Sequence, residues 1–389
     1  MGRYCRHVAQ LVPFFSRQEL TDRSLTQYRA ERYDLCMSFF AILFALLLEQ
    51  VRPPLRRNAV HEAAQGWARW CSRTMDTGAN THGWLAWGVI VLVPAASVLI
   101  LHWLLIWGLG WPGVLLTFVL HASVLYATLG FRQFSHHFTA IREALDAGDE
   151  VVAREGLAAW KQVETSELPR SEITRHVIEH SVLAAHRHVF AVLGWYALLA
   201  GFGLGPAGAV VYRMSEFANR YFARRNLATS SALVFRSSEA LSLASQTAWY
   251  VIDYLPARLS ALGFAIVGNF EDAIDSWRNF SQRLVRSGLA QDMNENDGVI
   301  LAATSGAINI RLGSDALKGI LSPLSTQDTE LTNHSELPLH DSTNVIRGSV
   351  SAVPDLQSVH LKVVVGLVWR CVVLWMLLLA LLTLARLLG

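Results

Sequence analysis

The sequence predicts an all-α, polytopic membrane protein with about four to five membrane helices, one broken or re-entrant glycine-rich helix, and cytoplasmic amphipathic helices. Three observations support this fold class. Only 16% of the 389 residues are charged and 52% are hydrophobic, whereas soluble domains carry about 25% charged residues. Several apolar stretches reach the roughly 20 helical residues that cross a bilayer core of about 30 Å. No run of any length alternates polar and apolar residues as strands do.

The first 36 residues differ from the rest of the chain. They mix charges of both signs and lack the apolar region of a secretory signal. At Met37 the character changes abruptly to MSFFAILFALLLEQVRPP. We hypothesise that translation begins at Met37 and that residues 1–36 are a non-native addition; a flexible cytoplasmic extension is the alternative. Peptide mapping of the native protein distinguishes the two, because a recovered peptide from residues 1–36 refutes the first.

Three stretches are predicted to cross the membrane fully. Trp84 to Leu109 has no acidic or strongly basic side chain, and Pro94 is expected to kink it. Val114 to Phe131 follows after a tight glycine–proline turn, so these two stretches form a hairpin with little outside the membrane. Val363 to Leu388 is the third span, and Arg370 near its start is expected to snorkel to the surface.

Three further apolar stretches are short or interrupted. Ser38 to Leu48 is a full span if Glu49 faces a protein interior, and a partly inserted helix otherwise. Val189 to Tyr212 is broken by GFGLGPAG, and we expect a buried or re-entrant helix pair there, because neighbouring protein satisfies the freed backbone groups. Leu259 to Val267 follows a proline and is expected to dip into the membrane.

The distribution of arginine sets the expected sidedness, since basic loops stay cytoplasmic. The segment after the first helix and residues 132–188 are rich in arginine, and the hairpin turn has none. Both segments are therefore placed inside, and residues 213–360 are placed there too. The predicted organisation is an extension at 1–36, a membrane domain at 37–321, a flexible polar loop at 322–360 and a closing membrane helix at 361–389.

Common metal and cofactor motifs find no support in their sequence context. The four cysteines have no CxxC spacing, so neither a zinc site nor a disulfide framework is expected. His176 and His180 share a helix face, as zinc ligands do, but no HExxH pattern accompanies them and we expect no metal. Gly203 to Gly208 match G-x-G-x-x-G, but a dinucleotide site needs a preceding strand. The net charge of only +2 implies no nucleic-acid partner.

Ionisable residues beside apolar helices are the candidate ligand-binding groups. Glu179, Arg187 and Arg213 flank the broken helix. Charged groups near membrane depth are costly and are retained mainly for pairing or for function. A purely structural ion pair is therefore the alternative interpretation of these three residues.

Two later segments supply the remaining candidates. Asp253 and Arg258 bracket DYLPAR, whose proline predicts a helix–turn–helix corner. A turn at 296–298 precedes a run of small residues that is expected to pack closely against another helix. No catalytic residue is assigned. The full set of ligand-binding candidates is Glu49, Glu179, Arg187, Tyr212, Arg213, Asp253, Arg258, Asn296 and Gly298.

Four segments occur in a specific order along the chain. They are AGDEVVAREGL (147–157), GPAGAVVYR (205–213), DYLPARLSAL (253–262) and NDGVILAATSGAINIRLG (296–313). In this order they resemble the CobD/CbiB family of cobalamin-biosynthesis membrane proteins, together with the related AmpE proteins of β-lactamase regulation. The resemblance covers about residues 37–320 and the closing helix. For catalytic members it implies a cobinamide-phosphate synthase, which joins aminopropanol to a corrinoid carboxylate as an amide with ATP.

Several acidic positions of the family are replaced in this chain. Of the family's E-x-x-x-E-N-x-x-D run only Glu179 keeps an acid, and Arg187 stands where the aspartate is expected. Trp249 and Tyr250 stand at the family's paired aspartate. The other replacements are Leu183, Ala184, Ile300, Leu301 and the run from Glu216 to Arg220. Because carboxylates hold Mg²⁺, the scaffold is better supported than the synthase activity.

The resemblance and these departures imply a bacterial inner-membrane protein that is a non-catalytic, AmpE-like paralogue with a ligand-sensing or signalling-support role. The alternative is an active adenosylcobinamide-phosphate synthase that uses Glu49, Glu179 and Asp253 in a shifted arrangement. Only that alternative requires ATP and Mg²⁺. The expected partners are the lipid bilayer and a corrinoid or cell-wall-derived small molecule. A transporter is disfavoured, because the single broken helix shows no inverted repeat.

Overall fold

The structure is a computed structural model that describes residues 37–49, 57–109, 111–161, 168–227, 238–286, 295–313 and 358–388. Within these residues the regular secondary structure is entirely helical, which confirms the predicted all-α class. The predicted extension at 1–36 and most of the predicted polar loop at 322–360 lie outside the described residues.

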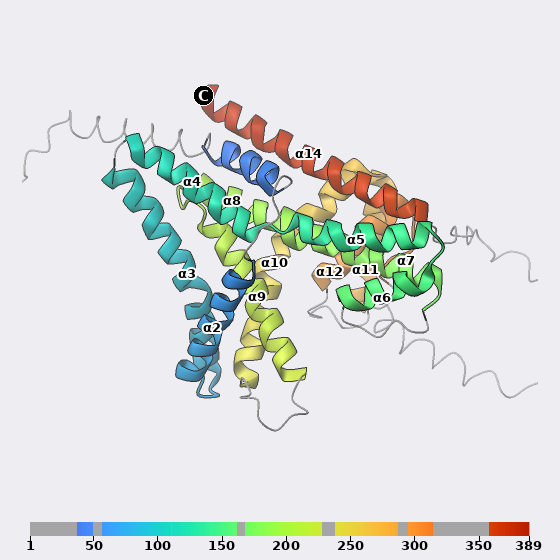
Figure 1. Ribbon diagram of the computed structural model, residues 1–389, viewed down its shortest axis with the longest axis horizontal. Helices are drawn as coiled ribbons and strands as arrows, with labels where there is room; N and C mark the ends of the chain where they lie inside the picture. The colour runs from blue at the N-terminus through green and yellow to red at the C-terminus, as the bar shows by residue number, and fades with distance from the viewer. Residues whose placement is uncertain are drawn as a thin grey trace, which may run out of the picture.

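The chain order of the helices is shown in Figure 1. A first apolar helix, Met37–Glu49, precedes them. The labelled helices are α2 (Arg57–Met75), α3 (Asn80–Gly108), α4 (Trp111–Thr128), α5 (Phe131–Asp146), α6 (Glu150–Lys161), α7 (Arg170–Ala185), the π-helical segment η1 (His186–Phe190), α8 (Ala191–Gly201), α9 (Ala207–Leu227), α10 (Glu239–Val267), α11 (Phe270–Arg286), α12 (Glu295–Ile308) and α14 (Ser358–Leu388).

Four helical segments in the described part of the chain are long and apolar enough to cross a membrane. They are Asn80–Gly108, Arg170–Gly201, Glu239–Val267 and Val359–Ala385. Met37–Glu49 and Pro112–Thr128 are shorter apolar helices. This agrees with the predicted four to five membrane helices. The predicted span from Val114 to Phe131 ends early, because α4 stops at Thr128 and α5 begins a new helix at Phe131.

The predicted helix–turn–helix corner at DYLPAR is wrong, because α10 is one continuous helix with Pro256 inside it. The stretch from Leu259 to Val267 is accordingly the end of a full-length candidate span rather than a separate short insertion. A proline removes the N–H that would bond the carbonyl four residues earlier, which here is the carbonyl of Ile252. The Trp195 indole Nε1 donates to that carbonyl at 3.0 Å, so the Ile252 carbonyl keeps a donor and α10 continues through the proline.

The same arrangement occurs at the second intrahelical proline, Pro94 in α3. Its missing N–H frees the carbonyl of Ile90, and the Trp67 indole Nε1 on α2 donates to this oxygen at 3.3 Å. Lipid offers no hydrogen bonds, so a freed carbonyl in a membrane helix needs a protein partner. In both helices an indole from a neighbouring helix fills that need.

The predicted break in the apolar stretch from Val189 to Tyr212 is confirmed. Helix α8 ends at Gly201 and α9 begins at Ala207. Gly203 and Gly205, in the turn between them, have φ of +72° and +55°, which is a conformation that favours glycine. The residues before this turn are helical rather than a strand, so the G-x-G-x-x-G letters here are a helix break.

Helix α10 lies at the centre of the molecule and packs against α3, α9, α11, α12 and α14. In Figure 1 the α3–α4 hairpin lies at one end of the elongated molecule, and α5, α6 and α7 lie at the other. The predicted close packing of the small residues in α12 is confirmed: a Cβ on Gly306 would lie 2.1 Å from the Asp272 carbonyl oxygen of α11. This contact holds α12 against α11, and α12 also packs against α10, where the candidate site forms.

Candidate functional site

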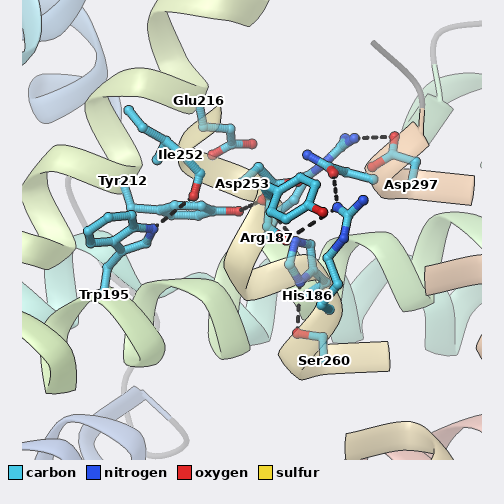
Figure 2. Close-up of polar contacts among 12 residues, drawn as sticks. His186, Arg187, Trp195, Tyr212, Glu216, Ile252, Asp253, Ser260 and Asp297 are labelled. Atoms are coloured by element: carbon cyan, nitrogen blue, oxygen red, sulfur yellow. Dashed lines mark hydrogen bonds and ion pairs between the residues drawn. The ribbon is translucent and has the colours of Figure 1, made fainter. Parts of the chain in front are cut away.

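The centre of the candidate site is a buried hydrogen-bonded group on η1, α9 and α10. His186 Nε2 lies 2.9 Å from Asp253 Oδ1, and His186 Nδ1 lies 2.9 Å from Ser260 Oγ. The Tyr212 hydroxyl donates to the same Asp253 oxygen at 2.8 Å. Figure 2 shows these side chains converging between the helices. All four residues are fully buried, and we refer to them as the Asp253 cluster.

The π-helical segment explains how neighbouring residues reach different partners. A π-turn inserts an extra residue into a helix and is frequent at functional sites. It begins at His186, whose ring points to α10, while the next residue, Arg187, donates through Nη2 to Asp297 Oδ2 of α12 at 2.5 Å. One turn of the chain thus connects the Asp253 cluster to the start of α12 (Figure 2).

Two polar atoms at this centre have no hydrogen-bond partner among the residues that the structure describes. They are Asp253 Oδ2 and Arg187 Nε, and both are buried. Buried polar atoms are nearly always hydrogen-bonded to protein or to ordered water. The pair therefore offers one acceptor and one donor to a water or to a polar ligand.

A second group of charges lies on α9. Glu216 is 3% exposed and accepts hydrogen bonds from Arg213 and, at 2.9 Å, from Arg220 Nη1. Burial acts to raise the pKa of Glu216, but Arg213, with further help from His188, Arg220 and Arg187, holds that pKa below its ordinary value. The carboxylate is therefore ionised and neutralised by the arginines around it.

A third group joins α10 to α12. Arg258 donates to Glu295 and to the Asn296 side-chain oxygen, and its guanidinium lies 3.5 Å from the centre of the Tyr254 ring. The Tyr250 hydroxyl donates to Glu295 at 2.7 Å, and Asn296 Nδ2 donates to the Tyr250 carbonyl at 3.0 Å. Candidates Arg258 and Asn296 are thus brought together.

The structure places three other candidates outside these groups. Glu179 Oε1 accepts the Gly313 backbone N–H at 2.7 Å, so it ties the segment after α12 to α7. Glu49 is 3% exposed at the end of the first helix. Gly298 takes part through packing, because a Cβ there would lie 2.1 Å from the Phe280 ring. The described residues hold no group of three His, Cys, Asp or Glu arranged for a metal ion.

Sequence reasoning missed several residues that the fold brings into the site. These are His186, Ser260, Glu216, Tyr250, Glu295 and Asp297. For His186 a signal existed, since an ionisable residue within a long apolar helix is a functional candidate by default. Glu216 and Tyr250 stand at replaced family positions but were not assigned to the site. For Ser260, Glu295 and Asp297 the sequence holds no distinguishing pattern, because their partners lie 37 to 110 positions away.

Comparisons with known proteins agree with this architecture. The family profile described as CobD/Cbib protein matches residues 40–228. A Stutzerimonas stutzeri protein named cobalamin biosynthesis protein CobD is 27% identical over 347 residues, which cover 88% of this chain and 96% of that protein. A Chromobacterium violaceum protein of the same name is 28% identical over 204 residues, covering 52% of this chain and 58% of the relative.

A third relative with this name, from Pelobacter propionicus, is 27% identical over 233 residues, covering 59% of this chain and 65% of the relative. No solved structure matches the chain at a significant level. The family match, the relative aligned almost end to end and the four candidate membrane helices agree with one another. The chain is a multi-pass inner-membrane protein that resembles the CobD/CbiB family over residues 40–228.

Proposed function

We propose that this chain acts in cobalamin biosynthesis as a non-catalytic member of its family, which binds a small polar ligand in a sensing or signalling-support role. One observation supports this above the others: the described carboxylates around the Asp253 cluster are each paired with a basic side chain. Glu216 pairs with Arg213, Asp297 with Arg187, and Glu295 with Arg258. Asp253 itself pairs with His186.

These paired carboxylates do not fit a magnesium–nucleotide site. Mg²⁺ is held by carboxylate oxygens and phosphates, so each acid would first have to leave its own cation. Of these acids Glu216 and Asp253 are buried, and breaking a buried ion pair leaves an uncompensated charge and costs about 3–5 kcal/mol. Arg187, which stands where the family pattern has an aspartate, adds positive charge at the centre of the site. We therefore derive no ATP-dependent step for this chain.

The open atoms of the site support a ligand that both donates and accepts hydrogen bonds. Asp253 Oδ2 can accept and Arg187 Nε can donate, and an amide group carries both a donor and an acceptor. Corrinoids carry such amide groups on their periphery. The names of the relatives make a corrinoid the first ligand to test, and the AmpE-like interpretation makes a cell-wall-derived small molecule the second.

The experiment uses the full chain, purified in detergent or lipid nanodiscs. With cobyric acid, aminopropanol phosphate and ATP we expect no amide product by mass spectrometry. We expect a corrinoid to quench the fluorescence of Trp195 and Trp249, which lie beside the cluster. Asp253→Asn is expected to weaken this binding by about tenfold, the effect of losing one charged hydrogen bond. Glu179→Gln is the matched control, because that buried acid serves the Gly313 backbone instead.

The alternative is an active synthase. It is favoured by the alignment with the Stutzerimonas stutzeri protein, which extends over 96% of that relative. Amide formation by the purified chain would establish it and refute the non-catalytic proposal. Failure of the gene to restore corrinoid synthesis in a strain that lacks the synthase would count against it.

A further inference from the structure

Three buried polar side chains outside the Asp253 cluster are hydrogen-bonded in series. His102 lies on α3, His121 on α4 and Tyr196 on α8, and their exposed fractions are 1%, 1% and 0%. His121 Nε2 lies 3.0 Å from His102 Nδ1, and His121 Nδ1 lies 2.8 Å from the Tyr196 hydroxyl oxygen. Because the two bonds use both nitrogens of the middle ring, the three groups form one continuous chain.

The hydrogen bonds of this chain have one common direction. A neutral imidazole has one N–H and one lone-pair nitrogen. When the Tyr196 hydroxyl donates to His121 Nδ1, the His121 proton is on Nε2 and points to His102, whose proton is then also on Nε2. When every bond reverses, both rings carry their proton on Nδ1. The two states differ only in the positions of the protons.

At one end, Tyr196 opens into a small cavity between the first helix, α8 and α14. The cavity has a volume of about 20 Å³, which is enough for one water molecule. Its lining is mostly apolar but includes Ser38 and Thr383 beside Tyr196. A water in this cavity would have the side chains of Ser38, Thr383 and Tyr196 within its lining.

At the other end, His102 lies under the turn between α8 and α9. A Cβ on Gly205 would lie 2.8 to 2.9 Å from three atoms of the His102 ring, so a glycine is required for the ring to occupy this place. Phe202 in the same turn is 75% exposed. The chain therefore ends beneath a turn that reaches the molecular surface.

We propose that His102, His121 and Tyr196 form a proton relay between the cavity and this turn. A hydronium ion at the molecular surface supplies a proton through water in the cavity to the Tyr196 oxygen, while the phenolic proton moves to His121 Nδ1. The Nε2 proton of His121 moves to His102 Nδ1, and the Nε2 proton of His102 leaves to a water at the turn. One proton enters and one leaves, and each ring changes tautomer without keeping a charge.

The chemistry of the location supports a relay over a simple packing role. Apolar side chains would fill the same space without the cost of burying polar groups. Ionisable residues retained within membrane helices mark proton relays and ion paths. A series of three such groups that ends at a cavity matches that use.

The test follows exchange of the imidazole N–H protons with deuterated solvent by NMR, on the full chain labelled with ¹⁵N-histidine in lipid nanodiscs. His102→Gln and His121→Gln assign the two signals. In Tyr196→Phe the ring remains and the hydroxyl is lost, so we expect exchange at His121 to slow by about tenfold or more, the usual scale of losing a proton-transfer partner. A packing role predicts unchanged or faster exchange, because a lost hydrogen bond loosens the site.

Thr117→Val is the matched control. Thr117 is fully buried on α4, one turn before His121, and its hydroxyl is outside the relay. We expect this variant to exchange like the wild type. Exchange in Tyr196→Phe that equals or exceeds the wild-type rate overturns the proposal. If Tyr196→Phe does not fold, the ¹⁵N chemical shifts of the wild type are the test. They must show His102 and His121 in the same tautomer, and opposite tautomers overturn the relay.

Discussion

The indole of Trp195 should be energetically coupled to Pro256, because it replaces the hydrogen bond that the proline removes. Trp195→Phe leaves the Ile252 carbonyl without its 3.0 Å donor. An unsatisfied buried group costs about 1–3 kcal/mol. Trp195 and Ile252 are half-buried, and the free energies of hydrogen bonds measured inside membrane proteins lie near the low end of this range. We therefore expect the lost hydrogen bond to cost about 1 kcal/mol. The smaller ring adds a packing loss that does not depend on the proline.

A double-mutant cycle separates the two contributions. Pro256→Ala restores an N–H that bonds the Ile252 carbonyl within α10. In that background Trp195→Phe should cost only the packing loss, which gives a coupling of about 1 kcal/mol. The measurement is reversible unfolding of the purified chain in mixed micelles, followed by circular dichroism.

The control is Trp249→Phe, a buried tryptophan in the same helix whose indole makes a ring contact with Tyr212. Its effect should add to that of Pro256→Ala, because the two sites are two turns apart. If the effects of Trp195→Phe and Pro256→Ala also add within about 0.3 kcal/mol, the proposed coupling between the indole and the proline is refuted. The homologous cycle of Trp67 with Pro94 should show the same sign and a smaller size, because that bond is longer at 3.3 Å.

Three further predictions concern single positions. The ion pairs hold the pKa of Glu216 below its ordinary value. The extra stability of the wild type over Glu216→Gln should therefore be present above the unfolded-state pKa of about 4.3 and be lost as the pH falls below it. Melting temperatures measured against pH check this, and an equal pH dependence of the melting temperature in both proteins contradicts it. Gly205→Ala should lower the melting temperature, because φ is +55° and a histidine ring fills the space, whereas Gly201→Ala, with nothing within 4 Å, should not. Gly298→Ala should destabilise the chain through its contact with Phe280, and Phe280→Leu in the same chain should recover part of the loss.

The position of α10 shows where local reasoning ends. The proline in DYLPAR predicts a corner, because a lone proline disfavours the helical conformation at the preceding residue. The structure has a continuous helix instead, since Trp195 supplies the missing donor. That indole lies 57 positions before the Ile252 carbonyl, so no local pattern around the proline could have revealed it.

The candidate site was predicted in part. Charge beside the apolar helices pointed to Arg187 and Arg213, and the DYLPAR segment to Asp253. The fold does gather these residues, with the further candidate Tyr212, on η1, α9, α10 and α12. The prediction could not supply their partners. Glu179 was chosen on the same ground of charge, yet it accepts a backbone N–H, and Gly298, taken from the turn at 296–298, makes a helix contact.

The sequence by itself determined the class of this protein. Hydropathy and low charge specify membrane helices through local free energies of transfer, and the glycines after α8 specify a break through their own backbone freedom. Only the tertiary structure decided which polar and charged side chains pair with one another. Pairings such as Arg187 with Asp297, and the series from His102 to Tyr196, depend on helix packing. Helix packing is set by side-chain shape across the whole core, and such contacts leave no periodic signal along the chain.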